Sequence, residues 1–572
     1  MAIPPEGKPP PPAGGGAATR SGFDPQTGIY SSLVHFDHHS KIPTDPRLDA
    51  ATHVLSHFPS SKLAEARVAL IDSATGHRVT YAHVARSVAS LAAGLHLCLG
   101  IVKGDVVLVL SPNSVTYPVV CLAVLSIGAV VTTANPLNTA AEIAKQARDS
   151  GAKLAIAAPQ EMHKLSETGL PVLPTTGPTV NDDRRNDLSV EELIENCEPI
   201  DIPAEQKPRQ SDTAAILYSS GTTGTSKGVV LTHANFIAVV TMFKWSMEQS
   251  KSNDDVFLCF VPMFHIYGLV FFGLGLFCTG STTVVMRRYD FQEMLEAIQK
   301  HKVRNIPAVP PVILALVKHD SRSHNLSSLR RMGSGAAPLS KELAEAFRKK
   351  FPWVELRTGY GLTESCGATT FFATDQESKS RPGSSARLLP SFSAKVVDPA
   401  TGAALPPYGE GELWLKSPTV MKEYLGNKEA NDAAFDPEGW LKTGDLCYFD
   451  DEGYVYIVDR IKELIKYNGY QVAPAELEAV LTSHPRIVDA AVVPVEDEEA
   501  GQIPIAYVVK GAGNDDLTED QVMEFVARQV APYKKIRGVR FVGAVPKSAA
   551  GKILRRELML SERQGEPLAS KL

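Results

Sequence analysis

Cysteine pairs with the spacing of metal ligands are absent from this sequence of 572 residues. Its seven cysteines are scattered along the chain, and no two of them form a C-x-x-C pair. We therefore expect neither a zinc site nor a disulfide framework. This cysteine usage is typical of a protein made in a reducing compartment.

The chain also lacks an excess of positive charge. Its 58 lysine and arginine residues against 64 aspartate and glutamate residues give a formal net charge of −6. A chain that binds a polyanion normally carries a basic patch or tail. The sequence therefore predicts no nucleic-acid partner and no binding to an anionic membrane surface.

Apolar runs of membrane-spanning length are scarce. Residues 117–134 reach the threshold of about 18 residues for a transmembrane helix, and residues 256–280 exceed it. The second run contains Pro262, His265 and several glycines, and the flanking charges follow a soluble α/β pattern. We expect both runs to be buried core elements and predict no membrane span.

The two ends of the chain differ in character from the rest. The N-terminus is rich in proline, glycine and alanine and lacks the apolar region of a secretory signal, so we predict that residues 1–25 form a disordered tail. The chain ends in Ser570-Lys571-Leu572. S-K-L in this position is a peroxisomal address, which predicts peroxisomal localisation and an import receptor as a partner.

Between the ends, strand and helix patterns alternate. Residues 68–71 and 105–110 are predicted strands, and residues 80–97 and 115–127 have apolar positions at helical spacing. This alternation predicts a layered α/β domain with a largely parallel sheet. The length of the chain predicts more than one domain.

One short segment concentrates the residues that suit a polyphosphate. Residues 219–228 read S-S-G-T-T-G-T-S-K-G and lie between two apolar runs that we interpret as strands. Glycine lets the backbone approach a ligand, while backbone N–H groups, hydroxyls and an ammonium group bind phosphate. The alternative is a flexible hairpin loop. The pattern is not that of a Walker A loop, which requires G-K-[ST] at the start of a helix.

This segment resembles the phosphate-binding signature of the adenylate-forming superfamily, which includes acyl-CoA synthetases, luciferases and adenylation domains of peptide synthetases. Four further motifs follow in the family's order: P-M-F-H-I-Y at 262–267, S-G-A-A-P-L at 334–339, T-G-Y-G-L-T-E at 358–364, and W-L-K-T-G-D at 440–445. A fifth, P-K-S-A-A-G-K, ends at Lys552. The motif P-M-F-H-I-Y and the terminal S-K-L are similar to those of the peroxisomal 4-coumarate–CoA ligase-like group of plants. Thr358 and the segment 411–417 depart from the pattern of true 4-coumarate–CoA ligases.

The resemblance implies a fold and a set of cosubstrates. It implies a large N-terminal domain of several α/β subdomains over residues 26–460, a small mobile α+β domain over 461–569 with a hinge at Lys462, and the targeting tripeptide at 570–572. It implies ATP, Mg²⁺ and coenzyme A. Mg²⁺ usually takes one or two carboxylates together with substrate phosphates, so a single glutamate beside the nucleotide is enough.

The resemblance also implies roles for individual residues. Catalysis would fall to Lys552, His265, Lys466 and Thr363, with Glu364 holding the metal. Contacts to ATP or AMP would come from Ser219, Ser220, Gly221, Thr222, Thr223, Lys227, Ala336, Thr358, Gly359, Tyr360, Thr363, Asp445, Arg460, Lys462, Lys466, Gln471 and Lys552. The acyl group would contact His265, Tyr267, Phe271, Ser334 and Gly335, and coenzyme A would contact Arg288, Asn468 and Gly469.

The implied activity is formation of an acyl-adenylate and then of an acyl-CoA thioester. The acid could be hydroxycinnamic, fatty or a jasmonate precursor. Two other functions share these motifs: a luciferase-like monooxygenase, and an inactive homologue that binds an acyl group or a nucleotide. For Arg288, a solvated surface charge is an equal alternative to a CoA contact.

Overall fold

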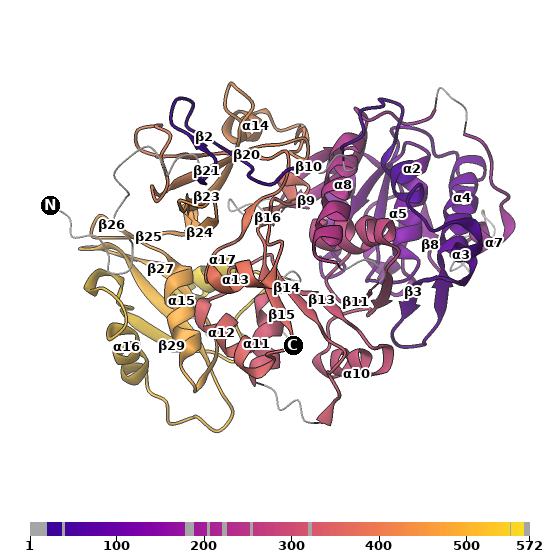
Figure 1. Ribbon diagram of the computed structural model, residues 1–572. Helices are drawn as coiled ribbons and strands as arrows, with labels where there is room; N and C mark the ends of the chain where they lie inside the picture. Colours follow the sequence, from indigo (N-terminus) through magenta and orange to yellow (C-terminus); the bar gives the residue numbers. More distant parts are fainter. Residues whose placement is uncertain are drawn as a thin grey trace.

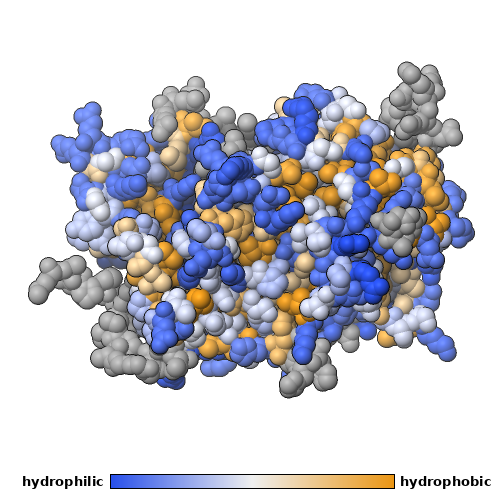
Figure 2. Space-filling view, turned by 90° about the horizontal axis from the view of Figure 1, so that it is seen from above, coloured by the Kyte–Doolittle hydropathy of each residue, from blue (hydrophilic) through white to orange (hydrophobic). Residues whose placement is uncertain are grey.

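The computed structural model describes residues 20–36, 41–177, 188–202, 206–219, 226–251, 255–318, 323–548 and 551–564. Six residues of the predicted phosphate loop, 220–225, lie outside these ranges, and they include the predicted site residues Ser220, Gly221, Thr222 and Thr223. Residues 1–19 and the tripeptide 570–572 lie outside them as well. In Figure 1 most purple elements of the N-terminal part lie on the right and the orange and yellow elements of the C-terminal part lie on the left, whereas the N-terminal strand β2 lies on the left because it pairs with β20. Polar and apolar side chains are interspersed on the face that Figure 2 shows.

A first seven-stranded sheet carries the phosphate-loop strands. Its inner strand β5 is buried at every position, as expected for a parallel strand covered on both faces. The predicted helix over 80–97 and strand over 105–110 are confirmed as α4 (Tyr81–Leu97) and β5 (Val106–Leu110). The strand order is β22 (Glu423–Tyr424), β10 (Lys227–Thr232), β9 (Thr213–Ser219), β6 (Val130–Thr133), β5, β7 (Ala152–Ala157) and β8 (Val172–Pro174).

A second seven-stranded sheet is parallel except at its β4 edge and supplies one wall of the site described below. Two of its strands, β14 and β15, each end at the first residue of a predicted motif, Ser334 and Thr358. In parallel strands these carboxyl ends meet at one edge of the sheet. The order is β15 (Glu355–Thr358), β14 (Arg331–Ser334), β13 (Asn305–Ala308), β11 (Val256–Cys259), β12 (Thr282–Val285), β3 (Val68–Asp72) and β4 (Arg78–Thr80).

A six-stranded antiparallel sheet corrects one prediction about the N-terminus. Phe23 lies in the first strand and packs at a tilt against the Tyr30 ring, which stacks on Phe449. Residues 20–25 are therefore ordered, because this aromatic cluster and the pairing with the next strand hold them. The order is β1 (Phe23–Asp24), β2 (Ile29–Ser31), β20 (Ser393–Val397), β21 (Gly411–Lys416), β23 (Leu441–Phe449) and β24 (Val455–Arg460).

The chain beyond Arg460 forms a separate sheet with its own apolar core. That core contains Ile465, Leu477, Val492, Val508 and Val522, all of which are fully buried. The strands are β25 (Ile465–Tyr467), β26 (Tyr470–Val472), β27 (Ile487–Asp497), β28 (Gly501–Lys510) and β29 (Gly538–Phe541), with helices α15 (Pro474–Ser483), α16 (Glu519–Ala527) and α17 (Arg555–Gln564).

The remaining helices cover the first three sheets, and the largest apolar core lies among them. Within the described ranges, no helix has both the length and the apolar character that crossing a membrane requires. The 256–280 run divides into β11, the short helices α9 (Ile266–Gly268), η2 (Leu269–Leu274) and η3 (Gly275–Thr279). The other α-helices are α2 (Ala50–Leu55), α3 (Ser61–Ala66), α5 (Tyr117–Ser126), α6 (Ala140–Ser150), α7 (Val190–Asn196), α8 (His233–Gln249), α10 (Phe291–His301), α11 (Pro310–Lys318), α12 (Lys341–Lys350), α13 (Asp375–Ser380) and α14 (Lys428–Ala434).

Candidate active site

One cavity of about 2110 Å³ lies where the large sheets meet the C-terminal part of the chain. It is lined at once by the ends of β9 and β14, by the segment after β15, and by residues of β25 and of the loop before α17. The predicted site residues that line it are Ser219, Lys227, His265, Tyr267, Phe271, Ser334, Gly335, Ala336, Thr358, Gly359, Tyr360, Thr363, Glu364, Arg460, Lys462, Lys466, Gln471 and Lys552.

Three predicted nucleotide residues form a connected group. The Tyr360 hydroxyl donates a hydrogen bond to Oδ2 of Asp445, and Nε of Arg460 lies 3.1 Å from Oδ1. Asp445 and Arg460 face each other because they are paired in the antiparallel register of β23 and β24. Burial raises the pKa of Asp445, while the Arg460 guanidinium acts in the opposite direction. Tyr360 and Arg460 line the cavity and hold the Asp445 carboxylate directly behind them, where it is an acceptor of the kind that ribose hydroxyls require.

The predicted metal ligand is held by a neighbouring tyrosine. The Tyr424 hydroxyl donates a 2.9 Å hydrogen bond to Oε1 of Glu364, and the Lys227 ammonium lies 4.8 Å from the centre of the Tyr424 ring. The described residues contain no group of three or more His, Cys, Asp or Glu side chains placed to hold a metal. A lone carboxylate beside an ammonium group fits Mg²⁺ that arrives with polyphosphate, since the phosphates supply the other oxygen ligands.

His265 is fixed at the start of the short helix α9. Its Nδ1 accepts a 3.3 Å hydrogen bond from the backbone N–H of Tyr267, which leaves the ring proton of the neutral imidazole on Nε2. Burial, with the Lys552 ammonium nearby, lowers the pKa of His265 to about 4. The turn itself needs glycine at 268, where a Cβ atom would lie 2.1 Å from the Pro262 carbonyl oxygen. The side chain therefore presents a neutral N–H donor at neutral pH.

Lys552 reaches the cavity from the C-terminal part of the chain. Its loop is closed by hydrogen bonds from the N–H of Ser548 to the Lys552 carbonyl and from the N–H of Gly551 to the Ser548 carbonyl, both 2.8 Å. A Cβ atom at Gly551 would lie 3.1 Å from Val309, so this loop sits directly against the loop that follows β13. Burial, and next the Arg460 guanidinium, lowers the pKa of Lys552. An anion bound in the cavity would offset both effects and favour the ammonium form of Lys552.

Lys466 and Gln471 enter the same cavity from a hairpin. They are paired across β25 and β26, and the Lys466 N–H donates a 3.0 Å hydrogen bond to Oε1 of Gln502. The turn between them consists of Asn468 and Gly469, with φ of 47° and 78°. Positive φ at both central residues is typical of a type I′ turn, which accounts for Asn-Gly at this position.

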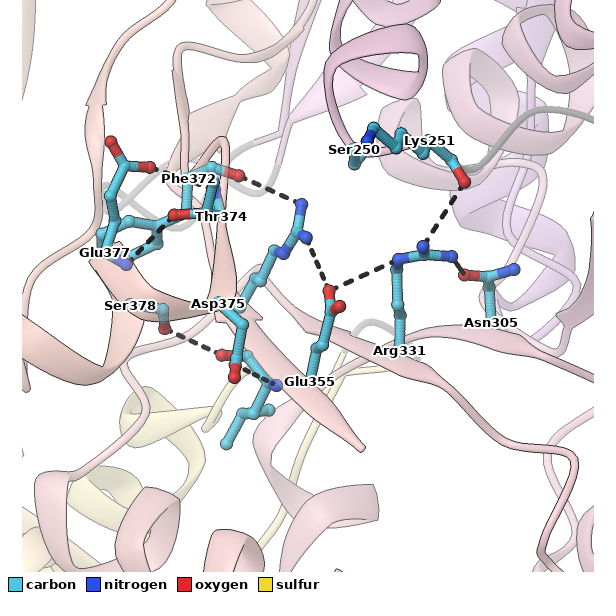
Figure 3. Close-up of polar contacts among 12 residues, drawn as sticks. Ser250, Lys251, Asn305, Arg331, Glu355, Phe372, Thr374, Asp375, Glu377 and Ser378 are labelled. Carbon is cyan, nitrogen blue, oxygen red and sulfur yellow. Dashed lines mark hydrogen bonds and ion pairs between the residues drawn. The ribbon is translucent and has the colours of Figure 1, made fainter. Parts of the chain in front are cut away.

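The predicted CoA contacts lie apart from the cavity lining. Arg288, Asn468 and Gly469 are exposed and do not line it. Several polar residues that line the cavity were not predicted from the sequence: Asn305, Arg331 and Arg357 at strand positions, and Tyr424 beside Glu364. Figure 3 shows the fork of Arg331 between Glu355, Asn305 and the Lys251 carbonyl. The charged residues within short buried strands were the available signal, since such residues are rarely buried unless they are paired.

Comparison with known proteins agrees with this arrangement. Residues 60–425 match the model of the AMP-binding enzyme family, and residues 476–552 match that of the AMP-binding enzyme C-terminal domain. The chain is 47% identical over 551 residues to peroxisomal OPC-8:0-CoA ligase 1 of Arabidopsis thaliana, covering 95% of this chain and 97% of that protein. It is 48% identical over 524 residues to 4-coumarate–CoA ligase-like protein 4 of Oryza sativa subsp. japonica, covering 91% and 93%.

Solved structures extend the likeness to the whole fold. o-Succinylbenzoate CoA synthetase from Bacillus subtilis, in complex with ATP and magnesium ion, superposes with a TM-score of 0.74 at 28% identity, covering 88% of this chain and 98% of that one. ATP-bound MatB from Rhodopseudomonas palustris superposes with a TM-score of 0.78 at 25% identity, covering 90% and 99%. The predicted α/β fold with a large N-terminal and a small C-terminal domain is confirmed.

Proposed function

We propose a substrate for this chain, which belongs to the AMP-binding enzyme family and is an AMP-forming acid–thiol ligase that uses ATP, Mg²⁺ and coenzyme A. The substrate is a fatty acid or a cyclopentanone-bearing jasmonate precursor, which the enzyme activates in the peroxisome. The observation that carries the choice of acid is the apolar part of the cavity. It is lined by Val239, Met242, Phe243, Met247, Phe257, Val270, Phe271 and Met332. Flexible methionines and aromatic rings suit an aliphatic chain or an alicyclic ring.

In the first half-reaction, the substrate carboxylate attacks the α-phosphorus of ATP and pyrophosphate leaves, giving an acyl-adenylate. Lys552 and Lys227 supply positive charge where the phosphate charge develops, and Thr363 adds a hydroxyl donor. Fixed charges and donors in a cavity that excludes water stabilise such a transition state strongly. Mg²⁺ held by Glu364 would neutralise phosphate charge. The neutral His265 orients the reacting carboxylate through its Nε2 proton.

In the second half-reaction, the CoA thiol loses its proton and attacks the adenylate carbonyl, and AMP leaves. We assign this step to a second pose of residues 461–569, turned about Lys462, in which Lys552 withdraws. Lys466 and Gln471 would then meet the nucleotide, and Asn468 and Gly469 would lie at the CoA entrance. Their exposed hairpin is free of the large core, which supports a role in a moving part.

Peroxisomal localisation rests on the terminal S-K-L and on the likeness to a peroxisomal ligase. A fluorescent protein fused in front of the complete chain should enter peroxisomes, and removal of residues 570–572 should leave it in the cytosol. Unchanged peroxisomal import after the truncation would contradict the role of the tripeptide.

The enzyme assay is CoA-dependent AMP formation across hexanoate to palmitate, a cyclopentanone-octanoate, 4-coumarate and caffeate. We expect the aliphatic and cyclopentanone acids to have the highest kcat/KM. Preference for the hydroxycinnamates would replace this proposal with a phenylpropanoid ligase. Light emission with oxygen consumption would indicate a luciferase-like reaction, and no pyrophosphate release with any acid would indicate an inactive binding homologue.

A further inference from the structure

Two of the seven cysteines differ from the others in their surroundings. Cys98 is exposed and Cys197 is half-buried, whereas the other five are buried. Burial raises the pKa of the Cys121 and Cys278 thiols to about 12, which leaves them protonated at neutral pH. Because the thiolate is the reactive form and needs access to its reagent, Cys98 and Cys197 are the cysteines that a reagent in solution can modify.

These two cysteines lie at the ends of neighbouring helices. Cys98 is the residue directly after α4 and Cys197 the residue directly after α7, and the two helices lie side by side in Figure 1. The Cys98 N–H donates a 2.9 Å hydrogen bond to the Gly94 carbonyl, and the Cys197 N–H donates one of 3.1 Å to the Leu193 carbonyl. The last turn of a helix therefore fixes the backbone of each cysteine.

Gly94 leaves room for sulfur between the two helices. A Cβ atom there would lie 2.9 Å from Cδ2 of Leu193 and 3.2 Å from Sγ of Cys197, so the Cys197 sulfur lies against α4 at Gly94. Cys98 follows Gly94 by one helical turn, and side chains of a helix lean toward its N-terminus, which directs the Cys98 side chain over the same glycine. The Cys197 thiol donates a hydrogen bond to the Cys98 sulfur. Burial, and next the Cys98 thiol, raises the pKa of Cys197.

We propose that Cys98 and Cys197 form an oxidation site, at which a hydroperoxide converts the two thiols into a disulfide that ties α4 to α7. The exposed Cys98 thiolate attacks one peroxide oxygen, the O–O bond breaks, and a sulfenic acid forms on Cys98 while the other oxygen leaves as water. The Cys197 thiolate then attacks the Cys98 sulfur, the S–O bond breaks, and a second water leaves as the S–S bond forms. The sulfur pair loses two electrons, the peroxide gains them, and both thiol protons end in water.

The cross-link acts on stability and leaves the ligase site intact, because neither cysteine lines the cavity. It closes a ring of about 100 residues, which contains β5, β6, β7 and β8 of the first sheet together with α5 and α6. A bond that closes so long a loop strongly restricts the unfolded chain, so the oxidised form unfolds at a higher temperature. The chain is made with reduced thiols, and the proposed peroxisomal location is where it would meet hydrogen peroxide.

The test treats the reduced full-length protein with hydrogen peroxide, blocks the remaining thiols by alkylation, and identifies linked peptides by mass spectrometry. We expect one linked pair, Cys98 with Cys197, and a fall in free thiols from seven to five because two are consumed. The Tm should rise by about 3–10 °C and return to its starting value after reduction with dithiothreitol. CoA-dependent AMP formation should be retained in the oxidised protein.

Two variants separate the roles of the cysteines. Cys98→Ser should show neither the cross-link nor the rise in Tm, and Cys197→Ser should accumulate a sulfenic acid on Cys98 that dimedone traps. Cys278→Ser is the matched control, because a serine hydroxyl still donates to the Leu274 carbonyl as the Cys278 thiol does, and it should form the cross-link as the wild type does. No linked peptide in the wild type, a cross-link between two copies of the chain through Cys98, or an equal rise in Tm in Cys98→Ser would each overturn the proposal.

Discussion

The Asp459 carboxylate accepts a 3.0 Å hydrogen bond from the backbone N–H of Ala475. Asp459 lies on β24 and is 6% exposed, whereas Ala475 lies in the first turn of α15, beyond the segment 461–463. A carboxylate at the N-terminus of a helix is favoured by the helix dipole. The bond therefore joins the large part of the molecule to the C-terminal part in the arrangement that places Lys552 in the cavity.

We expect Asp459→Ala to slow the adenylation half-reaction roughly tenfold, because the loss of a charge-assisted hydrogen bond makes this arrangement less populated. Single-turnover pyrophosphate release measures that step, and thioester formation from a supplied acyl-adenylate should be retained. Asp497→Ala is the control, since the Asp497 side chain accepts, among the described residues, only from the N–H groups of its own turn at Glu499 and Ala500. An equal loss in both half-reactions would contradict the interpretation.

Lys552→Ala separates the half-reactions more sharply. Removing a positioned charge from a transition state costs about 10²–10³ in rate, so adenylation should fall by at least this factor. Thioester formation from the supplied acyl-adenylate should change little. Lys534, which pairs with Glu476 and does not line the cavity, provides the control variant Lys534→Ala. Equal loss of both half-reactions in Lys552→Ala would rule out alternating roles for the C-terminal part.

The nucleotide end of the site was predictable because its residues occur in contiguous motifs. Tyr360, Asp445 and Lys552 were each identified within a short segment, and all belong to the observed site or border it. Their geometry was not predictable, because the pairing of Asp445 with Arg460 depends on the register of two strands. That register depends on the turn that joins the strands and on a bulge between Leu446 and Cys447, which the residue pattern alone does not show.

The acyl end was not predictable for the same reason. Arg331 and Glu355 are adjacent in space through strand pairing, and each by itself reads as a solvated charge. The N-terminal tail illustrates the opposite error. Strand β1 spans only two residues, too few to show a period of two, and is ordered through the ring contact of Phe23 with Tyr30.

The Phe271 ring should control the width of the acyl cavity. It contacts the ring of Phe243 edge-on at 4.8 Å and lies 6.1 Å from that of Tyr267, and it lines the cavity. We expect Phe271→Ala to raise kcat/KM for bulky or longer acids relative to hexanoate by about tenfold or more, because hydrophobic pockets discriminate ~10–200-fold per methylene. The same acid panel used for the wild type measures the ratio.

Phe272 provides the comparison for that variant. It is 0% exposed and does not line the cavity. Phe272→Ala should lower the free energy of unfolding by about 3–5 kcal/mol without a change in the order of acid preference. A shift in preference in Phe272→Ala as large as in Phe271→Ala would show that general loosening, and not cavity width, sets the specificity.

The buried His53 should make stability depend on pH in the mildly acidic range. Burial, with His57 and then Lys244 nearby, lowers its pKa to about 4 from an ordinary value of 6.5. Between these values the unfolded chain binds the proton and the folded protein does not, so His53 lowers the free energy of unfolding as pH falls from 6.5 toward 4, by up to roughly 3 kcal/mol.

The variant His53→Gln tests this prediction. Gln keeps a polar partner for the Thr241 hydroxyl, which lies 3.2 Å from Nε2 of His53, but does not titrate. In urea unfolding at pH 7.5, 6 and 5, the stability of His53→Gln relative to the wild type should therefore rise as pH falls. The exposed His163 supplies the control variant His163→Gln, and a pH-independent difference for His53→Gln would contradict the prediction.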